Sequence, residues 1–146
     1  MSNMKHYSII IFVVALAAAA AGFFLLRGPA ALKDGTYEAS ASGAFGDTNV
    51  TLTIREGRIA DCKLTAIDKE GRVKDEHYGE GSGEANHRLA QIALQGMRQY
   101  PGMLIEAQDS AGDALQALDK LDAVSGATVT FREFQAAAKE ALEKAR

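Results

Sequence analysis

The sequence has little of what several large classes of site require. Its one cysteine, Cys62, excludes an internal disulfide and any zinc or iron–sulfur site that takes several cysteine ligands from this chain alone. Its three histidines stand at no ligand-like spacing. The 16 Lys and Arg residues are outnumbered by 19 Asp and Glu residues, whereas nucleic-acid binding needs an excess of positive charge. We therefore expect no metal site and no nucleic-acid partner.

The length of 146 residues leaves room for one domain of roughly 110 residues and a terminal appendage. Residues 9–26 are all apolar or glycine, a run of 18 that, at about 1.5 Å per residue, nearly spans a bilayer core. We expect a transmembrane anchor there, after a short N-terminal segment, residues 1–8. A cleaved signal peptide is the alternative, because Lys5 precedes the run and small residues suit cleavage. The apolar run resumes after Gly22, which favours the anchor.

Residues 27–33, which contain a Gly-Pro pair and no periodic pattern, are predicted to form a short tether. We expect the folded domain to cover residues 34–146. Lys5 lies on one side of the predicted anchor, and Arg27 and Lys33 lie on the other. Positive charge therefore does not decide the orientation of the chain in a membrane.

Alternating apolar and polar residues in the first part of the domain predict three antiparallel strands. The first covers residues 36–42, and the second is centred on residues 50–54. Glu56 and Gly57 form a tight turn into a third strand, residues 58–67, so these two strands make a hairpin. The apolar side of the third strand is expected to hold Ala60, Cys62, Leu64 and Ala66. A sheet with one buried face needs a cover.

A polar loop and then helices are predicted to follow the sheet. Residues 68–83 contain four glycines and form a loop long enough to line a site, although an ordinary solvated connection has the same composition. The pattern turns helical at Glu84, and Pro101 and Gly102 are expected to end that helix. Residues 103–105 add a short helix or strand. The stripe of the first helix is expected to comprise Leu89, Ile92, Ala93 and Gly96.

The last helix is predicted to start at Thr130. Thr130 and Glu133 fit a capping box, in which the hydroxyl accepts from a first-turn amide and the carboxylate reaches back. The buried stripe of this helix is expected to hold Phe131, Phe134, Ala138, Ala141 and Leu142. The expected fold is therefore α+β: a small antiparallel, hairpin-based sheet covered by helices and preceded by one N-terminal transmembrane helix.

Residues 122–128, just before the last helix, are the best candidate for chemistry. Gly126 and Ala127 are small enough to let a bulky group approach the backbone. Several hydroxyls stand before a helix start, whose free amides and dipole favour a negative group such as a phosphate. An ordinary small-residue turn that leads into a helix cap is the alternative.

This run resembles the flavinylation motif of the FMN-binding domain family, the flavin-carrying domain of Rnf-type complexes and of sodium-pumping NADH:quinone reductases. In that family a flavin transferase, which uses FAD and magnesium, joins the FMN phosphate to a threonine through a phosphoester. The threonine ends an Asp-x-x-Ser/Thr-Gly-Ala-Thr run. The resemblance implies Thr128 as the acceptor of a covalent FMN, with Asp122, Ser125, Gly126 and Ala127 as the motif residues around it.

Thr130 is the competing hydroxyl, and its expected role as a helix cap leaves Thr128 free. The resemblance also covers the opening of the domain at Asp34 and the hairpin turn at Gly57. The loop at residues 76–83 differs from the Glu-Thr-Pro-Gly-like loop of larger relatives and looks more like that of short stand-alone members.

Two residues of this loop are candidates to contact the flavin ring. Tyr78 has the side chain to stack on the isoalloxazine, and His77 has the side chain to hydrogen-bond it. A loop-packing tyrosine and a solvated histidine are the alternatives.

A covalent bond suits a flavin that cannot be replaced once lost, a condition that holds outside the cytoplasm. Together with the resemblance, it favours a single-pass protein of the cell membrane with the domain on the extracytoplasmic face.

We expect an electron-transfer flavoprotein rather than an enzyme on its own, because the sequence shows no recognisable set of catalytic acid, base and nucleophile. The expected partners are the flavin transferase and membrane redox proteins such as quinone-linked oxidoreductases or cytochromes. A small extracytoplasmic flavin-dependent reductase with a soluble acceptor and a cofactor-free anchored binding module are the alternatives.

Overall fold

The computed structural model describes residues 31–146, which form one unit, Ala31–Arg146. The predicted N-terminal segment, the anchor and most of the tether lie outside these residues. Within residues 31–146, no helix combines the length and the apolar character needed to cross a membrane.

Three antiparallel strands, in the order β1-β2-β3, form the sheet. They are β1 (Gly35–Gly43), β2 (Gly46–Arg55) and β3 (Arg58–Ile67). A long loop with a short 3-10 helix, η1 (Glu80–Ser82), leads to four helices, which are α2 (Glu84–Met97), α3 (Tyr100–Ala111), α4 (Ala114–Asp119) and α5 (Thr128–Lys144). Strands precede helices, so the described part confirms the predicted α+β class.

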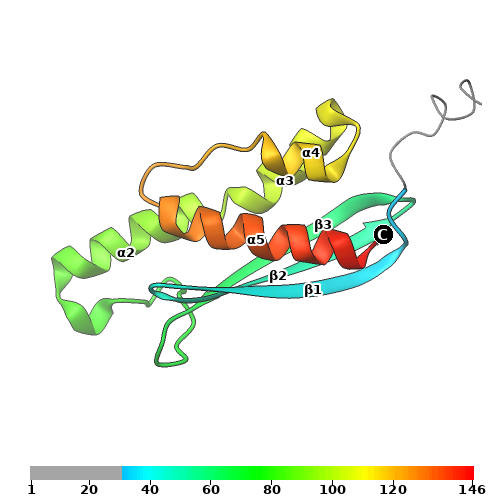
Figure 1. Ribbon diagram of the computed structural model, residues 1–146. Helices are drawn as coiled ribbons and strands as arrows, with labels where there is room; N and C mark the ends of the chain where they lie inside the picture. The colour runs from blue at the N-terminus through cyan, green and yellow to red at the C-terminus, as the bar shows by residue number, and fades with distance from the viewer. Residues whose placement is uncertain (1–30) are drawn as a thin grey trace, which may run out of the picture. The chain divides into compact units, whose positions relative to one another are not determined.

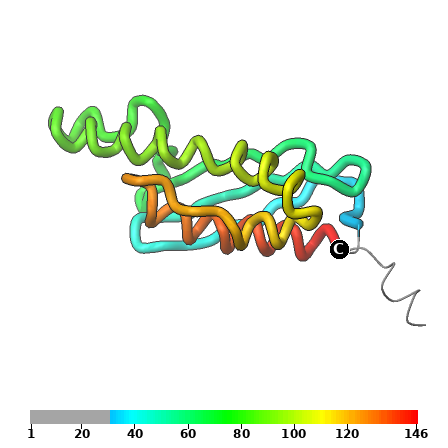
Figure 2. The backbone as a smooth tube through the Cα atoms, turned by 90° about the horizontal axis from the view of Figure 1, so that it is seen from above, coloured from blue at the N-terminus to red at the C-terminus, as the bar shows by residue number. Residues whose placement is uncertain are grey.

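The helices lie on one face of the sheet, as Figure 1 shows. Helix α5 packs on β1 and β2, α3 packs on β3, and α4 packs on α3 and α5. In Figure 2, α2 and α3 follow one another along the length of the sheet, with α5 beside them. The core between the two layers includes Val50, Leu52 and Ile54 from β2 and the predicted stripe of α5: Phe131, Phe134, Ala138, Ala141 and Leu142.

The strands match the predicted ranges closely, but the apolar side of β3 differs at one residue. A bulge shifts the register between Thr53 and Ile54, which pair with Asp61 and Ile59. The extra residue, Ala60, is exposed, and Ile59 is buried in its place. Burial of Ala60 was therefore a wrong prediction, because strict alternation does not survive a bulge. Cys62 is buried as predicted.

The predicted stripe of α2 is confirmed in part: Gly96 is buried and Ala93 is half-buried, but the other two residues are exposed. Leu89 is 65% exposed and Ile92 is 47% exposed, whereas Leu94 and Met97 are buried. In Figure 1 the start of α2 extends beyond the sheet, so only its last turns meet the core. The prediction that Leu89 and Ile92 are buried was wrong. Helical periodicity predicts the apolar face of a helix, but not which of its turns pack against the rest of the protein.

The chain between residues 97 and 111 also differs from the prediction. Helix α2 ends at Met97, before Pro101, and Pro101 lies in the first turn of α3. Proline is tolerated there because a first-turn amide has no partner within the helix. Residues 103–105, predicted as a short helix or strand, lie inside the 12-residue helix α3.

Helix α5 begins at Thr128, two residues before the predicted start. Its N-cap is Ala127, and no side chain caps its first turn among the described residues. The predicted capping box of Thr130 and Glu133 is therefore wrong. Glu133 instead accepts a hydrogen bond from Thr48 Oγ1 of β2 at 2.8 Å, an interaction across the fold that outcompetes the local one.

Candidate functional site

A cavity of about 480 Å³ opens where the start of α5 meets α2, the loop after β3 and the turn between β1 and β2. This volume lies within the range of about 300–1,000 Å³ that is usual for small-molecule sites. Helix α2 contributes an apolar wall that includes Leu94 and Met97. The opposite wall is the end of the predicted motif and the first turns of α5: Gly126, Ala127, Thr128, Val129, Thr130 and Glu133.

A buried tyrosine, Tyr100, stabilises the turn of the motif at residues 124–127 by two hydrogen bonds. The hydroxyl of Tyr100, the first residue of α3, accepts a hydrogen bond from Val124 N at 3.1 Å and donates one to Ala127 O at 3.0 Å. The ring of Tyr100 is fully buried and stacks on Phe134, with centroids 5.5 Å apart. Its burial raises the pKa of the hydroxyl, which stays a neutral donor at physiological pH.

Two glycines allow the motif to lie close to α2. Gly126 has φ of 85°, a left-handed conformation that L side chains rarely adopt. Gly96 of α2 lies directly against the motif, where an added Cβ would be 2.7 Å from Ala127 Cβ. The close approach of helix and turn therefore depends on the absence of a side chain at Gly96.

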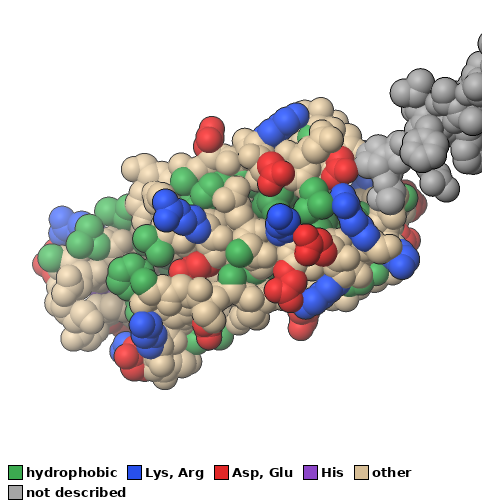
Figure 3. All heavy atoms as spheres, viewed as in Figure 1, with side chains coloured by type: hydrophobic (Ala, Val, Ile, Leu, Met, Phe, Trp, Pro, Cys, Tyr) green, Lys and Arg blue, Asp and Glu red, His purple; other side chains and the backbone are tan. Residues whose placement is uncertain are grey.

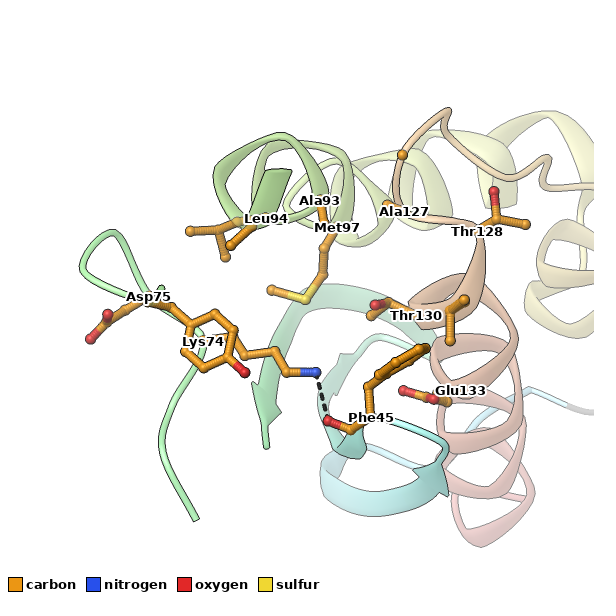
Figure 4. A pocket seen from close by; sticks show the side chains of 14 residues that line it. Phe45, Lys74, Asp75, Ala93, Leu94, Met97, Ala127, Thr128, Thr130 and Glu133 are labelled. Atoms are coloured by element: carbon orange, nitrogen blue, oxygen red, sulfur yellow. Dashed lines mark hydrogen bonds between the residues drawn. The ribbon is translucent and has the colours of Figure 1, made fainter. Parts of the chain in front are cut away.

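The two threonines of α5 stand differently in the cavity. Thr128, the first residue of the helix, is exposed, and Thr130 is half-buried. In Figure 4 the Thr130 side chain points toward Met97, whereas the Thr128 side chain lies at the rim and points away from it. Thr128 therefore presents its hydroxyl to a group that approaches from solvent.

The structure brings together five of the eight predicted site residues: Tyr78, Gly126, Ala127, Thr128 and Thr130 all line the cavity. Asp122 and Ser125 are exposed and lie outside the lining, on the stretch that leads into it. Tyr78 is held through its carbonyl, which accepts hydrogen bonds from His87 and Gln91. Desolvation raises the pKa of the Tyr78 hydroxyl.

His77 is not brought to this cavity. Its side chain is 72% exposed, and its Nδ1 lies 2.8 Å from Glu80 Oε1. The hydrogen bond with Glu80 raises the pKa of His77 above its ordinary value. The structure thus places His77 on the outer side of the loop, and its contact with a flavin stays a prediction.

Several lining residues were not connected with the site by the sequence analysis, among them Phe45, Lys74, Met97 and Glu133. Phe45 lies in the turn between β1 and β2 and is 63% exposed, although an aromatic side chain gains little in water. Lys74 Nζ donates a hydrogen bond to Phe45 O at 3.0 Å, which ties the loop to that turn (Figure 4). An apolar aromatic residue in a short hairpin turn was the one available signal.

Exposed apolar side chains surround the mouth of the cavity. Phe45 and Val129, which line the cavity, are 63% and 48% exposed. Ile92, which is 47% exposed, lies next to the lining residue Gly126. Figure 3 shows hydrophobic side chains gathered over α2 and the start of α5, whereas charges of both signs alternate over the rest of α5. Apolar rims of this kind are typical of sites that receive a ligand or a partner.

Comparisons with known proteins give one family match and two similar folds. The sequence profile of the FMN-binding domain matches residues 43–143. A search of the curated proteins found no match. The crystal structure of a Clostridium perfringens protein is similar in fold, with a TM-score of 0.53, 21% identity and coverage of 78% of this chain and 88% of that one. A solution NMR structure from Clostridium thermocellum gives a TM-score of 0.44, 25% identity and coverage of 79% and 93%.

The profile match includes β2, β3, the cavity and the whole motif at residues 122–128. It spans well over half of the 146 residues. The chain belongs to the FMN-binding domain family.

Proposed function

We propose that this chain is a membrane-anchored electron-transfer flavoprotein with FMN joined by a phosphoester to Thr128. Family membership supports a flavin-binding role and FMN as the cofactor. One observation carries the point of attachment: the exposed Thr128 hydroxyl stands at the uncapped start of α5, on the rim of the cavity.

The residues of the site fit the two ends of FMN. The first-turn amides of α5 have no side-chain cap among the described residues, and such amides attract a phosphate. The isoalloxazine ring is large and flat with one polar edge, and the cavity offers Leu94, Met97 and Phe45 as apolar surfaces and Lys74 as a cation. FMN supplies one- and two-electron chemistry when bound, and the protein's residues set its position and exposure.

The attachment reaction is a phosphoryl transfer with FAD as the donor, catalysed by a flavin transferase with magnesium. The Thr128 oxygen bonds to the FMN phosphorus, the bond between the two phosphates of FAD breaks, AMP leaves, and the hydroxyl proton passes to a base. The exposure of Thr128 suits this step because a separate enzyme must reach the hydroxyl. Thr130 is half-buried and faces inward, which makes it the weaker candidate.

The proposed setting is the extracytoplasmic face of the cell membrane, with residues 9–26 as the anchor. A carrier confined to that surface has no cytoplasmic pool of FMN from which to replace a lost cofactor, and a phosphoester prevents the loss. Quinone-linked oxidoreductases and cytochromes are the proposed electron donors and acceptors.

Intact-mass spectrometry and visible absorption of protein co-expressed with a flavin transferase test the attachment. The wild type is expected to gain the mass of one FMN less one water and the yellow colour of a flavin. Thr128→Ala should lose both, whereas Thr130→Ala, the matched control, should keep both. Added FMN mass in Thr128→Ala, or its loss only in Thr130→Ala, would contradict the assignment.

A further inference from the structure

Helix α5 carries a carboxylate into the cavity wall. Glu133 lies five residues beyond Thr128, about 7.5 Å along the helix axis, and both residues line the cavity. A ring joined to Thr128 through the ribityl phosphate has to enter the cavity from its rim. It would then lie along the wall that Glu133 forms.

The Glu133 carboxylate is fixed in place by the sheet. Thr48 Oγ1 donates a hydrogen bond to Glu133 Oε2 at 2.8 Å, and Thr48 itself is fully buried. Gly43, at the end of β1, leaves room for the other oxygen, because a Cβ at that position would overlap Glu133 Oε1. The position of the carboxylate therefore depends on two strands: β2 supplies the hydrogen bond from Thr48, and β1 leaves space for the carboxylate at Gly43.

The negative charge of Glu133 is not neutralised by an ion pair within the described residues. Among the ion pairs of residues 31–146, none includes Glu133. Lys74 also lines this cavity, and its Nζ donates a hydrogen bond to Phe45 O. The other carboxylate of the lining, Asp75, accepts from the backbone of His77 and points away from Met97 in Figure 4.

We propose that Glu133 sets the redox potential of the flavin in this cavity. A fixed negative charge beside the ring disfavours the uptake of electrons and so lowers the midpoint potential. Thr48 and Gly43 act as positioning residues that keep the charge at the wall. The inference rests on the proposed function, because that function puts the isoalloxazine ring in the cavity.

Spectroelectrochemical titration of the FMN-loaded protein tests this role. Glu133→Gln keeps the size of the side chain and an oxygen that accepts from Thr48, but removes the charge. Its midpoint potential should be more positive, by on the order of tenfold in the equilibrium constant for reduction, which is about 30 mV for a two-electron couple. Thr48→Val keeps the charge but frees it to move into solvent, so its potential should rise by less.

Glu143→Gln is the matched control. It removes the same charge from the same helix at an exposed position ten residues further on, about 15 Å along the axis and beyond the Debye length of about 10 Å at 0.1 M salt. Its potential should equal that of the wild type. Equal potentials for wild type and Glu133→Gln, with FMN mass present in both, would overturn the inference alone, and so would an equal shift in Glu143→Gln. Wild type without FMN mass would overturn the proposed function and the inference together.

Discussion

The hydroxyl of Tyr100 bridges the turn that presents Thr128, because it donates to the carbonyl oxygen of Ala127 at 3.0 Å while it accepts from the amide of Val124 at 3.1 Å. Both contacts reach a segment more than 20 residues away in the chain, across a junction of α3, the motif and α5. Ala127 O also accepts the first helical bond of α5, from Phe131 N. One buried side chain thus fixes the turn and the helix start together.

Replacement of Tyr100 by phenylalanine should loosen this turn. Tyr100→Phe keeps the stacked ring but leaves the amide of Val124 without its acceptor, which should cost about 1–3 kcal/mol of the free energy of unfolding. FMN attachment by the transferase should slow at a temperature where the variant is fully folded. Urea unfolding and the time course of FMN mass gain measure the two effects.

Tyr37→Phe provides the control for that substitution. Tyr37 donates one exposed hydrogen bond, to Lys33 O at 3.0 Å, far from the motif in the chain. Its loss should change stability by well under 1 kcal/mol and leave the rate of attachment unchanged. An attachment rate for Tyr100→Phe equal to that of the wild type would show that the turn does not need the hydroxyl.

The sheet could be predicted from the sequence, because strand periodicity and turn chemistry are local properties. Residues 58–67 were predicted as a strand and form β3 with the same bounds, after a turn in which Glu56 and Gly57 both have positive φ. The stripe of α5 was also predictable, since five apolar residues recur at helical spacing over three turns.

The site was less predictable, since its key contacts join distant segments. Thr130 and Glu133 match a capping box, but Glu133 binds Thr48, 85 residues earlier in the chain. Phe45 became a cavity residue only because its hairpin turn meets α5 and the loop at Lys74. A local sequence pattern predicts contacts between residues that are close in the chain. It does not predict a tertiary contact that replaces one of them, because that contact depends on the whole fold.

Substitution by alanine should destabilise the protein at Gly96 but not at Gly102, the next glycine along the chain. In Gly96→Ala the new Cβ would meet Ala127 Cβ at 2.7 Å and Val124 Cγ1 at 3.3 Å. Overpacking of this kind costs about 1–3 kcal/mol, more than the roughly 0.5–1 kcal/mol gained by removing glycine from a helix. Stability should fall, and FMN attachment should fall with it because the motif is displaced.

Gly102→Ala is the matched helical control. Gly102 lies in α3, and nothing stands within 4 Å of an added Cβ. This variant should gain up to about 1 kcal/mol in the free energy of unfolding and attach FMN as the wild type does. Thermal unfolding of both variants and the wild type measures these changes in stability. A stabilised Gly96→Ala would show that the motif moves to accommodate the extra methyl group without a loss of stability.

Asp34 should make the stability of the hairpin depend on pH. Its two carboxylate oxygens accept hydrogen bonds from the amides of Gly57 at 3.0 Å and Glu56 at 3.1 Å. These bonds lower the pKa of Asp34 below its ordinary value. A lowered pKa in the folded state adds stability above the unfolded pKa of about 3.9, and that stability is lost as the pH falls through the folded value.

Thermal unfolding of wild type and Asp34→Asn between pH 7 and pH 2 tests this dependence. The wild type should unfold at the higher temperature at neutral pH, and the gap between the two proteins should close below about pH 4. A gap that stays constant over the whole range would mean that the charge of Asp34 does not strengthen the turn.

Cys62 should be unreactive in the folded protein. Its thiol is buried beneath the helices at 6% exposure, and this burial, aided by the nearby charge of Asp61, raises its pKa to about 12. The thiolate is the reactive form, so at pH 8 the folded protein holds far less of it than an unfolded chain, in which the thiol has a pKa near 8.5. Iodoacetamide at pH 8 should therefore leave the native mass unchanged while it adds one carbamidomethyl group in 8 M urea, a routine denaturing concentration. Labelling at equal rates in both conditions would mean that the sheet opens far more often than its packed face implies, because alkylation reports the population of the opened state.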